Sequence, residues 1–395
     1  MKRAVLLLIV TLLASPCHAQ GQRRITQKQR ANLLKRFPGA DANKDGKLSD
    51  EEIRKFAGGM RGGQRGGGVP KSFKPNPGWK EGRFPEHAVC YKSPKEISQI
   101  YASKLGPKRK NTKPVTSYEK PNDGSLRIVG TGHSFMAPGY KSFPAIARLS
   151  GLKQPMPFTH TGGGMTGSAR YKWEQENGIF QFDGKPLPKL LASIANAKWD
   201  AMMWGPYYQD EPEYYACWID FCLKYNPDMK FFISDAWPQL EQFKQRPKSA
   251  EELTYDAFRK LGEERNAATA KIVSQLNRKY SDRVFVMPTS DAMVLAVREF
   301  HAGNLPGIDG IHKVVGGKDR SLWRDRLGHL GPGLGDLEGY VFYSTIYGKS
   351  AESIEKPLHN QGQFPGAKLD RTFRRIAWEA VSKHPLSGVK KSEIE

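Results

Sequence analysis

The segment at residues 126–135, Leu-Arg-Ile-Val-Gly-Thr-Gly-His-Ser-Phe, constrains the fold of this chain more than any other. It is a short apolar run that ends in Gly130 and Gly132 and is followed at once by His133 and Ser134. An apolar run of this length bounded by glycines predicts a buried strand with a sharp exit. Open α/β sheets bind their ligands at the carboxyl ends of the strands. Ser134 is therefore the strongest candidate for a nucleophile in the sequence.

Short apolar runs alternate with helical patterns through the rest of the chain. Strands are predicted at residues 126–130, 201–204, 230–233 and 283–287, and helices at residues 143–150, 187–197, 213–225, 249–280 and 336–347. Ser249 with Glu252 forms a capping box before the fourth helix, and Asp336 is expected to cap the last one. Such alternation predicts an α/β fold, in which a mostly parallel sheet lies between helices on both faces.

Four segments of this region resemble, in order, the sequence blocks of the SGNH or GDSL-like serine hydrolases. They are residues 126–135, with Gly-His-Ser where the family has Gly-Asp-Ser, residues 161–165 (Thr-Gly-Gly-Gly-Met), residues 199–205 (Trp-Asp-Ala-Met-Met-Trp-Gly) and residues 325–333 (Asp-Arg-Leu-Gly-His-Leu-Gly-Pro-Gly). The resemblance covers about residues 126–349. It implies a three-layer α/β/α domain of flavodoxin-like type and the hydrolysis of esters. It also implies that Gly163 donates a backbone N–H to the oxyanion.

The chemistry of the candidate residues fits that implication. A serine hydroxyl becomes a good nucleophile when a base takes its proton, and an imidazole such as that of His329 titrates near neutral pH. An aspartate such as Asp325 fixes the tautomer of the ring and stabilises its charged form. A backbone N–H at a glycine turn stabilises the tetrahedral oxyanion, and one such donor contributes about 3 kcal/mol. Ser134, His329, Asp325 and Gly163 are the predicted catalytic residues.

Three departures from the family pattern leave alternatives open. Asp325 precedes His329 by four residues, whereas the family has three, and the pair Asp309 and His312 has the usual spacing. We prefer His329 because the Gly-Pro-Gly turn after it matches the ending of the family's last block. The third block carries an asparagine in the family, whereas Gly205 is followed here by Pro-Tyr-Tyr. The third departure, His133 in place of the aspartate, is expected to be structural.

The amino terminus predicts an exported protein. Lys2 and Arg3 precede an apolar run at residues 4–14 that is too short to span a bilayer, and small residues then lead to a cleavage point after Ala19. A lipid anchor at Cys17 is the alternative. We expect a signal peptide at residues 1–19, an EF-hand module at 20–60, a Gly/Pro-rich linker and connector at 61–125, the hydrolase domain at 126–350 and a C-terminal extension at 351–395. The predicted localisation is secreted or periplasmic, with no transmembrane segment.

Residues 41–52 resemble an EF-hand calcium loop. The expected ligands, at their usual offsets, are Asp41, Asn43, Asp45, the backbone carbonyl of Lys47, Ser49 and Glu52. Gly46 stands where the loop needs its tight turn. Because a single loop is present and EF-hands usually pair, we expect Ca²⁺ to have a structural role.

The net charge of +22 bears on the partners. Its cationic residues are dispersed and no nucleic-acid motif accompanies them, so we expect no nucleic-acid partner. Anionic polysaccharide, an anionic cell surface or solubility alone accounts for the charge. The leading prediction is an exported serine esterase that removes acyl groups, acetyl above all, from carbohydrate and needs no catalytic cofactor. The alternatives are an esterase acting on lipid or small-molecule esters, and a catalytically inactive protein of this fold that binds carbohydrate and calcium.

Overall fold

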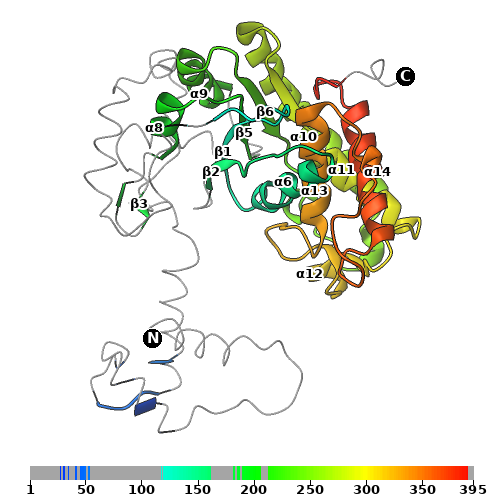
Figure 1. Cartoon of the computed structure of the whole chain (residues 1–395). Helices are drawn as coiled ribbons and strands as arrows, with labels where there is room; N and C mark the ends of the chain where they lie inside the picture. Colours follow the sequence, from blue (N-terminus) through cyan, green and yellow to red (C-terminus); the bar gives the residue numbers. More distant parts are fainter. Residues whose placement is uncertain are drawn as a thin grey trace. The chain divides into compact units, whose positions relative to one another are not determined.

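The computed structural model describes residues 121–161, 189–205 and 212–389. It also describes scattered positions between residues 27 and 53, residues 117, 119 and 120, and two short strands at residues 181–182 and 185–186. The chain divides into two compact units, Met1–Gly68 and Val69–Glu395. The second unit contains the central sheet and the helices that pack against it (Figure 1).

A five-stranded sheet with the order β2-β1-β5-β6-β7 forms the centre of the second unit. Its strands are β1 (Ile128–Gly132), β2 (Phe158–Thr161), β5 (Ala201–Trp204), β6 (Lys230–Ser234) and β7 (Val284–Met287). All four neighbouring pairs are parallel. Numbered along the chain, these strands have the order 2-1-3-4-5, which is that of flavodoxin-like doubly wound folds. In such folds the ligand site lies at the carboxyl end of the first strand, where the strand order reverses.

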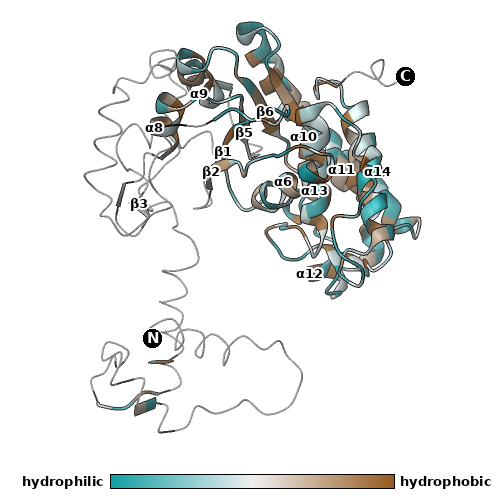
Figure 2. Ribbon diagram, in the orientation of Figure 1, coloured by the Kyte–Doolittle hydropathy of each residue, from teal (hydrophilic) through white to brown (hydrophobic). Residues whose placement is uncertain are grey.

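Both faces of this sheet are buried, which explains why β5 and β7 are apolar at every position. Ile128 and Met203 belong to one hydrophobic cluster, whereas Val129, Met202 and Trp204 belong to a second cluster. Successive side chains of a strand point to opposite faces, so the two clusters are the two sides of the sheet. Figure 2 shows β5 and β6 in the hydrophobic colour and a mixture of both colours on helices such as α10.

Helices lie on both sides of the sheet, as the alternation of the sequence predicts. They are α6 (Ala137–Leu149), α8 (Lys189–Asn196), α9 (Pro212–Tyr225), α10 (Tyr255–Tyr280), α11 (Thr289–His301), α12 (Lys313–Gly316), α13 (Leu334–Tyr347) and α14 (Ala367–Lys383). Helices α6, α11, α13 and α14 contribute to the first cluster, α8 and α9 to the second, and the long helix α10 to both. Within the described ranges no helix is long and apolar enough to cross a membrane.

Short elements complete the second unit. They are the two-stranded sheets of β3 (Gln181–Phe182) with β4 (Lys185–Pro186) and of β8 (Gly310–His312) with β9 (Ser321–Trp323), and the 3-10 turns η4 (Leu240–Gln242), η5 (Ala250–Glu252) and η6 (Ala351–Ser353). The β8–β9 pair is parallel and leads into the loop that carries His329.

Two predicted helix caps are wrong. Helix α10 begins at Tyr255, and its cap is Thr254, whose hydroxyl accepts the Ala257 N–H at 3.3 Å. Ser249 precedes η5 and makes no capping hydrogen bond with its side chain, because the 3-10 turn at residues 250–252 separates it from the helix. Asp336 is not a cap either, since α13 begins at Leu334 and places Asp336 inside the first turn.

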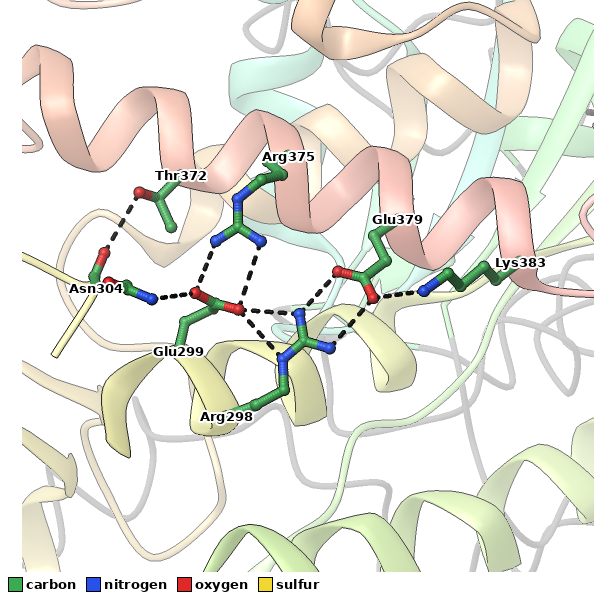
Figure 3. Close-up of polar contacts among 7 residues, drawn as sticks. All are labelled: Arg298, Glu299, Asn304, Thr372, Arg375, Glu379 and Lys383. Atoms are coloured by element: carbon green, nitrogen blue, oxygen red, sulfur yellow. Dashed lines mark hydrogen bonds and ion pairs between the residues drawn. The ribbon is translucent and has the colours of Figure 1, made fainter. Parts of the chain in front are cut away.

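Helices α11 and α14, which were not predicted, pack against each other and against the core. In α14, Phe373, Ile376 and Val381 are fully buried, so the segment that we described as an extension contributes to the first hydrophobic cluster. Figure 3 shows the polar contacts that join the two helices: Arg375 binds Glu299, Arg298 binds Glu379, and Thr372 donates to the carbonyl of Asn304, which follows α11. Further contacts on each side complete the network: Arg298 and Asn304 also bind Glu299, and Lys383 also binds Glu379. This network fixes α14 on α11.

Candidate active site

Ser134 lies on a tight turn between β1 and α6. Strand β1 ends at Gly132, the Met136 N–H donates to the His133 carbonyl at 3.1 Å, and α6 begins at Ala137. The Ser134 side chain is exposed at this carboxyl edge of the sheet. The turn therefore presents a serine hydroxyl to solvent at the place where the strand order reverses.

The glycines of this segment are required by close packing rather than by a left-handed turn. A Cβ at Gly130 would overlap the hydroxyl of Tyr140, which donates to the Met203 carbonyl at 3.2 Å. A Cβ at Gly132 would lie 3.0 Å from the Cα of Gly205 at the end of β5. The glycines thus let the end of β1 approach both α6 and β5, and so determine where Ser134 lies.

The structure brings Ser134, His329 and Asp325 together. His329 Nε2 lies 2.6 Å from Ser134 Oγ, and His329 Nδ1 lies 2.9 and 2.8 Å from the two carboxylate oxygens of Asp325. A carboxylate only accepts hydrogen bonds, so the ring proton lies on Nδ1 and the Nε2 lone pair faces the serine hydroxyl. Partial burial acts to raise the pKa of Asp325, but hydrogen bonds from His329 outweigh it and hold that pKa below its ordinary value. Asp325 is therefore ionised at neutral pH.

A turn accommodates the unusual spacing of four residues between Asp325 and His329. The Gly328 N–H donates to the Asp325 carbonyl at 3.0 Å, and Gly328 has a φ of 79°, a left-handed conformation that favours glycine. One oxygen of Asp325 also accepts the N–H groups of Leu327 and His329 at 3.1 and 3.3 Å. The loop at residues 325–329 thus folds around the carboxylate, so the extra residue does not separate the two side chains.

Two aromatic residues that the sequence analysis did not select support the histidine. The Phe135 ring packs edge-on against the His329 ring at 5.2 Å and stacks on Trp237 at 5.1 Å. Trp237 is fully buried, and its indole N–H donates to the Gly328 carbonyl at 2.8 Å. Trp237 follows the end of β6 by three residues, so its position at the same carboxyl edge was the available signal. Together these rings hold the loop that carries His329.

The alternative pair, Asp309 and His312, has a different environment. His312 is 2% exposed, and its Nδ1 accepts the Val314 N–H at 3.2 Å, which caps α12. Burial lowers the pKa of His312 to about 4, so the ring is neutral near pH 7. Within the described part of the chain, no hydrogen bond joins it to Asp309 or to Ser134. The structure therefore brings His329, and not His312, to the serine.

The predicted oxyanion donor, Gly163, lies outside the described residues, as do residues 206–208 after β5. Gly205, which is described, donates its N–H to the Thr131 carbonyl at 2.9 Å. Its N–H is therefore engaged in holding β5 beside β1 and does not serve an oxyanion.

The N-terminal loop is described at most of its predicted ligand positions, but Asn43 lies outside the described residues. The Asp41 carboxylate accepts the N–H groups of Asp45 and Gly46 at 3.1 and 2.8 Å, and Gly46 has a φ of 77°. The hydroxyl of Ser49 donates to Glu52 at 2.7 Å. Among the residues that the structure describes, no three His, Cys, Asp or Glu side chains converge as a metal site. Backbone N–H groups of the loop thus converge on the Asp41 carboxylate, while the Glu52 carboxylate accepts a hydrogen bond from Ser49.

The chain has a distant structural likeness to a solved protein. The chain is similar to the crystal structure of a DUF4886 family protein from Bacteroides uniformis, with 10% sequence identity and a TM-score of 0.41 over 65% of this chain and 95% of that chain. No protein-family model matches the sequence, and no curated protein matches it. The function is therefore inferred from the geometry of the site.

Proposed function

We propose that this protein is a serine esterase of SGNH-like type. The observation that carries the proposal is the continuous hydrogen-bond chain from Ser134 through His329 to Asp325, with its contacts of 2.6 and 2.8 Å. Three side chains from segments nearly 200 positions apart are arranged as nucleophile, base and orienting carboxylate. A serine that merely ended a strand would not need an imidazole within hydrogen-bond distance of its hydroxyl.

The mechanism follows from the direction of these hydrogen bonds. Ser134 Oγ attacks the ester carbonyl while His329 Nε2 takes its proton, and Asp325 stabilises the imidazolium that forms. When the tetrahedral intermediate collapses, its bond to the leaving alcohol breaks and His329 returns the proton to that alcohol. Water then attacks the acyl-serine with the same base, which releases the acid and restores Ser134. Gly163 is the proposed source of an oxyanion N–H, by its resemblance to the family's second block.

Carbohydrate esters, acetyl esters above all, are the proposed substrates. The export signal and the net charge of +22 favour a polymer or surface outside the cell over an intracellular metabolite. The exposure of Ser134 on an open edge of the sheet favours an ester that projects from a larger molecule. An ester of lipid or of a small molecule is the alternative within the same chemistry.

Labelling with a serine-directed fluorophosphonate tests the proposal, together with hydrolysis of 4-nitrophenyl acetate. We expect the mature protein to be labelled and to hydrolyse the ester, and Ser134→Ala to do neither. Ser353→Ala, an exposed serine on η6, is the matched control and should behave like the wild type. If the wild type is neither labelled nor active, the esterase proposal is wrong, and the alternative of an inactive binding protein of this fold is the one to test next.

We also propose that the loop at residues 41–52 binds Ca²⁺. The fit is supported by the left-handed Gly46 and by the inward-facing Asp41 carboxylate, which are features that an EF-hand loop requires. Asp41, Asn43, Asp45, Ser49 and Glu52 would supply side-chain oxygens, and Lys47 its carbonyl. Calorimetry should detect Ca²⁺ uptake that Asp41→Ala abolishes and that Lys47→Ala preserves, because Lys47 contributes only backbone. Uptake unchanged by Asp41→Ala would refute this site.

A further inference from the structure

A cavity of about 530 Å³ adjoins the loop that carries His329. Its walls include Lys141 of α6, Arg324 and Leu330 at the two ends of that loop, and Leu358 with His359 from the segment before α14. A volume of this size lies in the range of sites that bind small organic molecules. We call it the α6–α13 groove.

The α6–α13 groove is lined by residues close in the chain to the two reacting side chains, although neither Ser134 nor His329 lines it. On one side, the first residue of α6 that lines the groove is Pro138, which follows Ser134 by four residues. On the other, Arg324 and Leu330 immediately flank the loop at residues 325–329, and the Arg324 N–H donates to the His329 carbonyl at 2.9 Å. The groove thus lies one residue along the chain from His329 and four from Ser134, and these two side chains are in hydrogen-bond contact, so it is the candidate site for the part of a substrate that extends beyond the ester.

The carboxylate that lines the groove already has a partner, whereas the two cations that line it are still available to an anion. The Lys141 side chain is exposed, and no ion pair involving it occurs among the described residues. The Arg324 guanidinium is 58% exposed, and its carboxylate neighbour Asp325, 3.6 Å away, is already hydrogen-bonded to His329. The one carboxylate of the lining, Asp336, is bound by His359 Nε2 at 2.6 Å. Two cations are thus left to meet an anion from outside.

We propose that the α6–α13 groove binds the carboxylate of an acidic sugar whose ester is cleaved at Ser134, with Lys141 and Arg324 as the groups that recognise the charge. The inference rests on the proposed esterase function and specifies its substrate class. Arginine presents a planar fork that matches a carboxylate, and lysine adds a mobile point charge. The apolar side chains of Leu330 and Leu358 provide a surface for the sugar ring.

A matched pair of substrates tests this proposal. One is an O-acetylated oligogalacturonide, and the other is the same oligosaccharide with its carboxylates converted to methyl esters. The wild type should release acetate from the acidic form with a kcat/KM at least about tenfold higher, as expected for a charge-assisted contact. The Lys141→Gln/Arg324→Gln double variant should bring the ratio of the two kcat/KM values close to one. Arg324 adjoins Asp325, so its replacement can also slow the chemical step. Such an effect acts equally on both substrates and therefore cancels in the ratio of their kcat/KM values.

Lys260→Gln on α10 removes one positive charge from an exposed site outside the groove, so it should keep the wild-type ratio. The preference should also weaken as the salt concentration rises. Hydrolysis of 4-nitrophenyl acetate with no preference for the acidic oligosaccharide, or with a preference that the double variant retains, overturns the groove proposal alone. Failure of the wild type to hydrolyse any of the three esters overturns the esterase function and this inference with it.

Discussion

Replacement of Asp325 by asparagine separates the role of this carboxylate from its structural contacts. The asparagine oxygen can still accept the N–H groups of Leu327 and His329, which the carboxylate accepts at 3.1 and 3.3 Å. The charge beside Nδ1 is lost, and an amide N–H facing Nδ1 would favour the tautomer whose Nε2 carries the proton. That tautomer cannot take a proton from Ser134. The fold should therefore survive, while the base is disabled.

The size of the effect follows from the exposure of the carboxylate. Loss of the aspartate charge in a serine triad lowers kcat by about 10⁴-fold where the aspartate is buried. The Asp325 side chain is 40% exposed, so water partly replaces its stabilisation of the imidazolium. We expect kcat for 4-nitrophenyl acetate to fall by about 10²- to 10³-fold, or about 3–4 kcal/mol in the activation barrier.

Steady-state kinetics at pH 8 measure this prediction, with Asp309→Asn as the matched control. Because the pKa of Asp325 lies below its ordinary value, the carboxylate is fully ionised at this pH and the measured loss reports removal of its charge. Asp309→Asn should retain most of the wild-type activity, since no hydrogen bond of its side chain reaches His312 in the described structure. If Asp325→Asn keeps more than about a fifth of the activity while Asp309→Asn loses it, the assignment of the pair is wrong.

Three further substitutions test the packing that positions the site. Trp237→Phe removes the indole N–H that holds the loop carrying His329. Urea denaturation should therefore show a free energy of unfolding lower by about 1–3 kcal/mol, and kcat should fall by a larger factor than KM rises. An unchanged kcat would contradict this role. Gly130→Ala should cost about 1–3 kcal/mol by overlap with the Tyr140 hydroxyl, and Tyr140→Phe in the same chain should restore part of that loss. Asp200→Asn removes the charge that binds the nearly buried Arg127 at 2.8 Å and should cost about 2–3 kcal/mol at pH 7. Burial acts to raise the pKa of Asp200, but the hydrogen bonds from Arg127 hold it below the ordinary value. The stability difference is therefore fully present above about pH 4 and falls as the pH drops through the lowered pKa. A difference that grew below that pH would contradict this.

Strands with continuous apolar sequence were the most predictable part of the fold. Strand β5 has the predicted bounds, Ala201–Trp204, because both of its faces are buried and every position is apolar. Strand β2 was not predicted, since Phe158 is its single apolar residue and its strand conformation comes from parallel pairing with β1. Helix α14 has apolar residues at Leu369, Phe373 and Ile376, a helical spacing that would have revealed it.

The three polar residues of the candidate site were predictable from the sequence, but the aromatic residues that pack around them were not. Ser134 follows a glycine-rich strand end, and His329 precedes a Gly-Pro-Gly turn, so both have local sequence signals. Trp237 has only the weak signal of its place after β6, and Phe135 has none of its own, because an aromatic residue that packs in the core and one that orients a base have the same sequence pattern. The distinction depends on a single long-range hydrogen bond, from the Trp237 indole to the Gly328 carbonyl, which is 91 positions away.

The spacing between Asp325 and His329 differs from that of the family that the sequence resembles, yet the two side chains are in hydrogen-bond contact. In the family a spacing of three residues brings the two side chains together, whereas here the backbone turns at Gly328 with a φ of 79° and closes the loop around the carboxylate. A side chain at Gly328 would be strained by that φ, and its Cβ would also lie 2.9 Å from Gln239. The contact between Asp325 and His329 across a spacing of four residues therefore depends on glycine at position 328. The geometry requires only that Nδ1 of the histidine lies within hydrogen-bond distance of a carboxylate. Different spacings along the chain can meet this requirement, provided that the backbone turns accordingly.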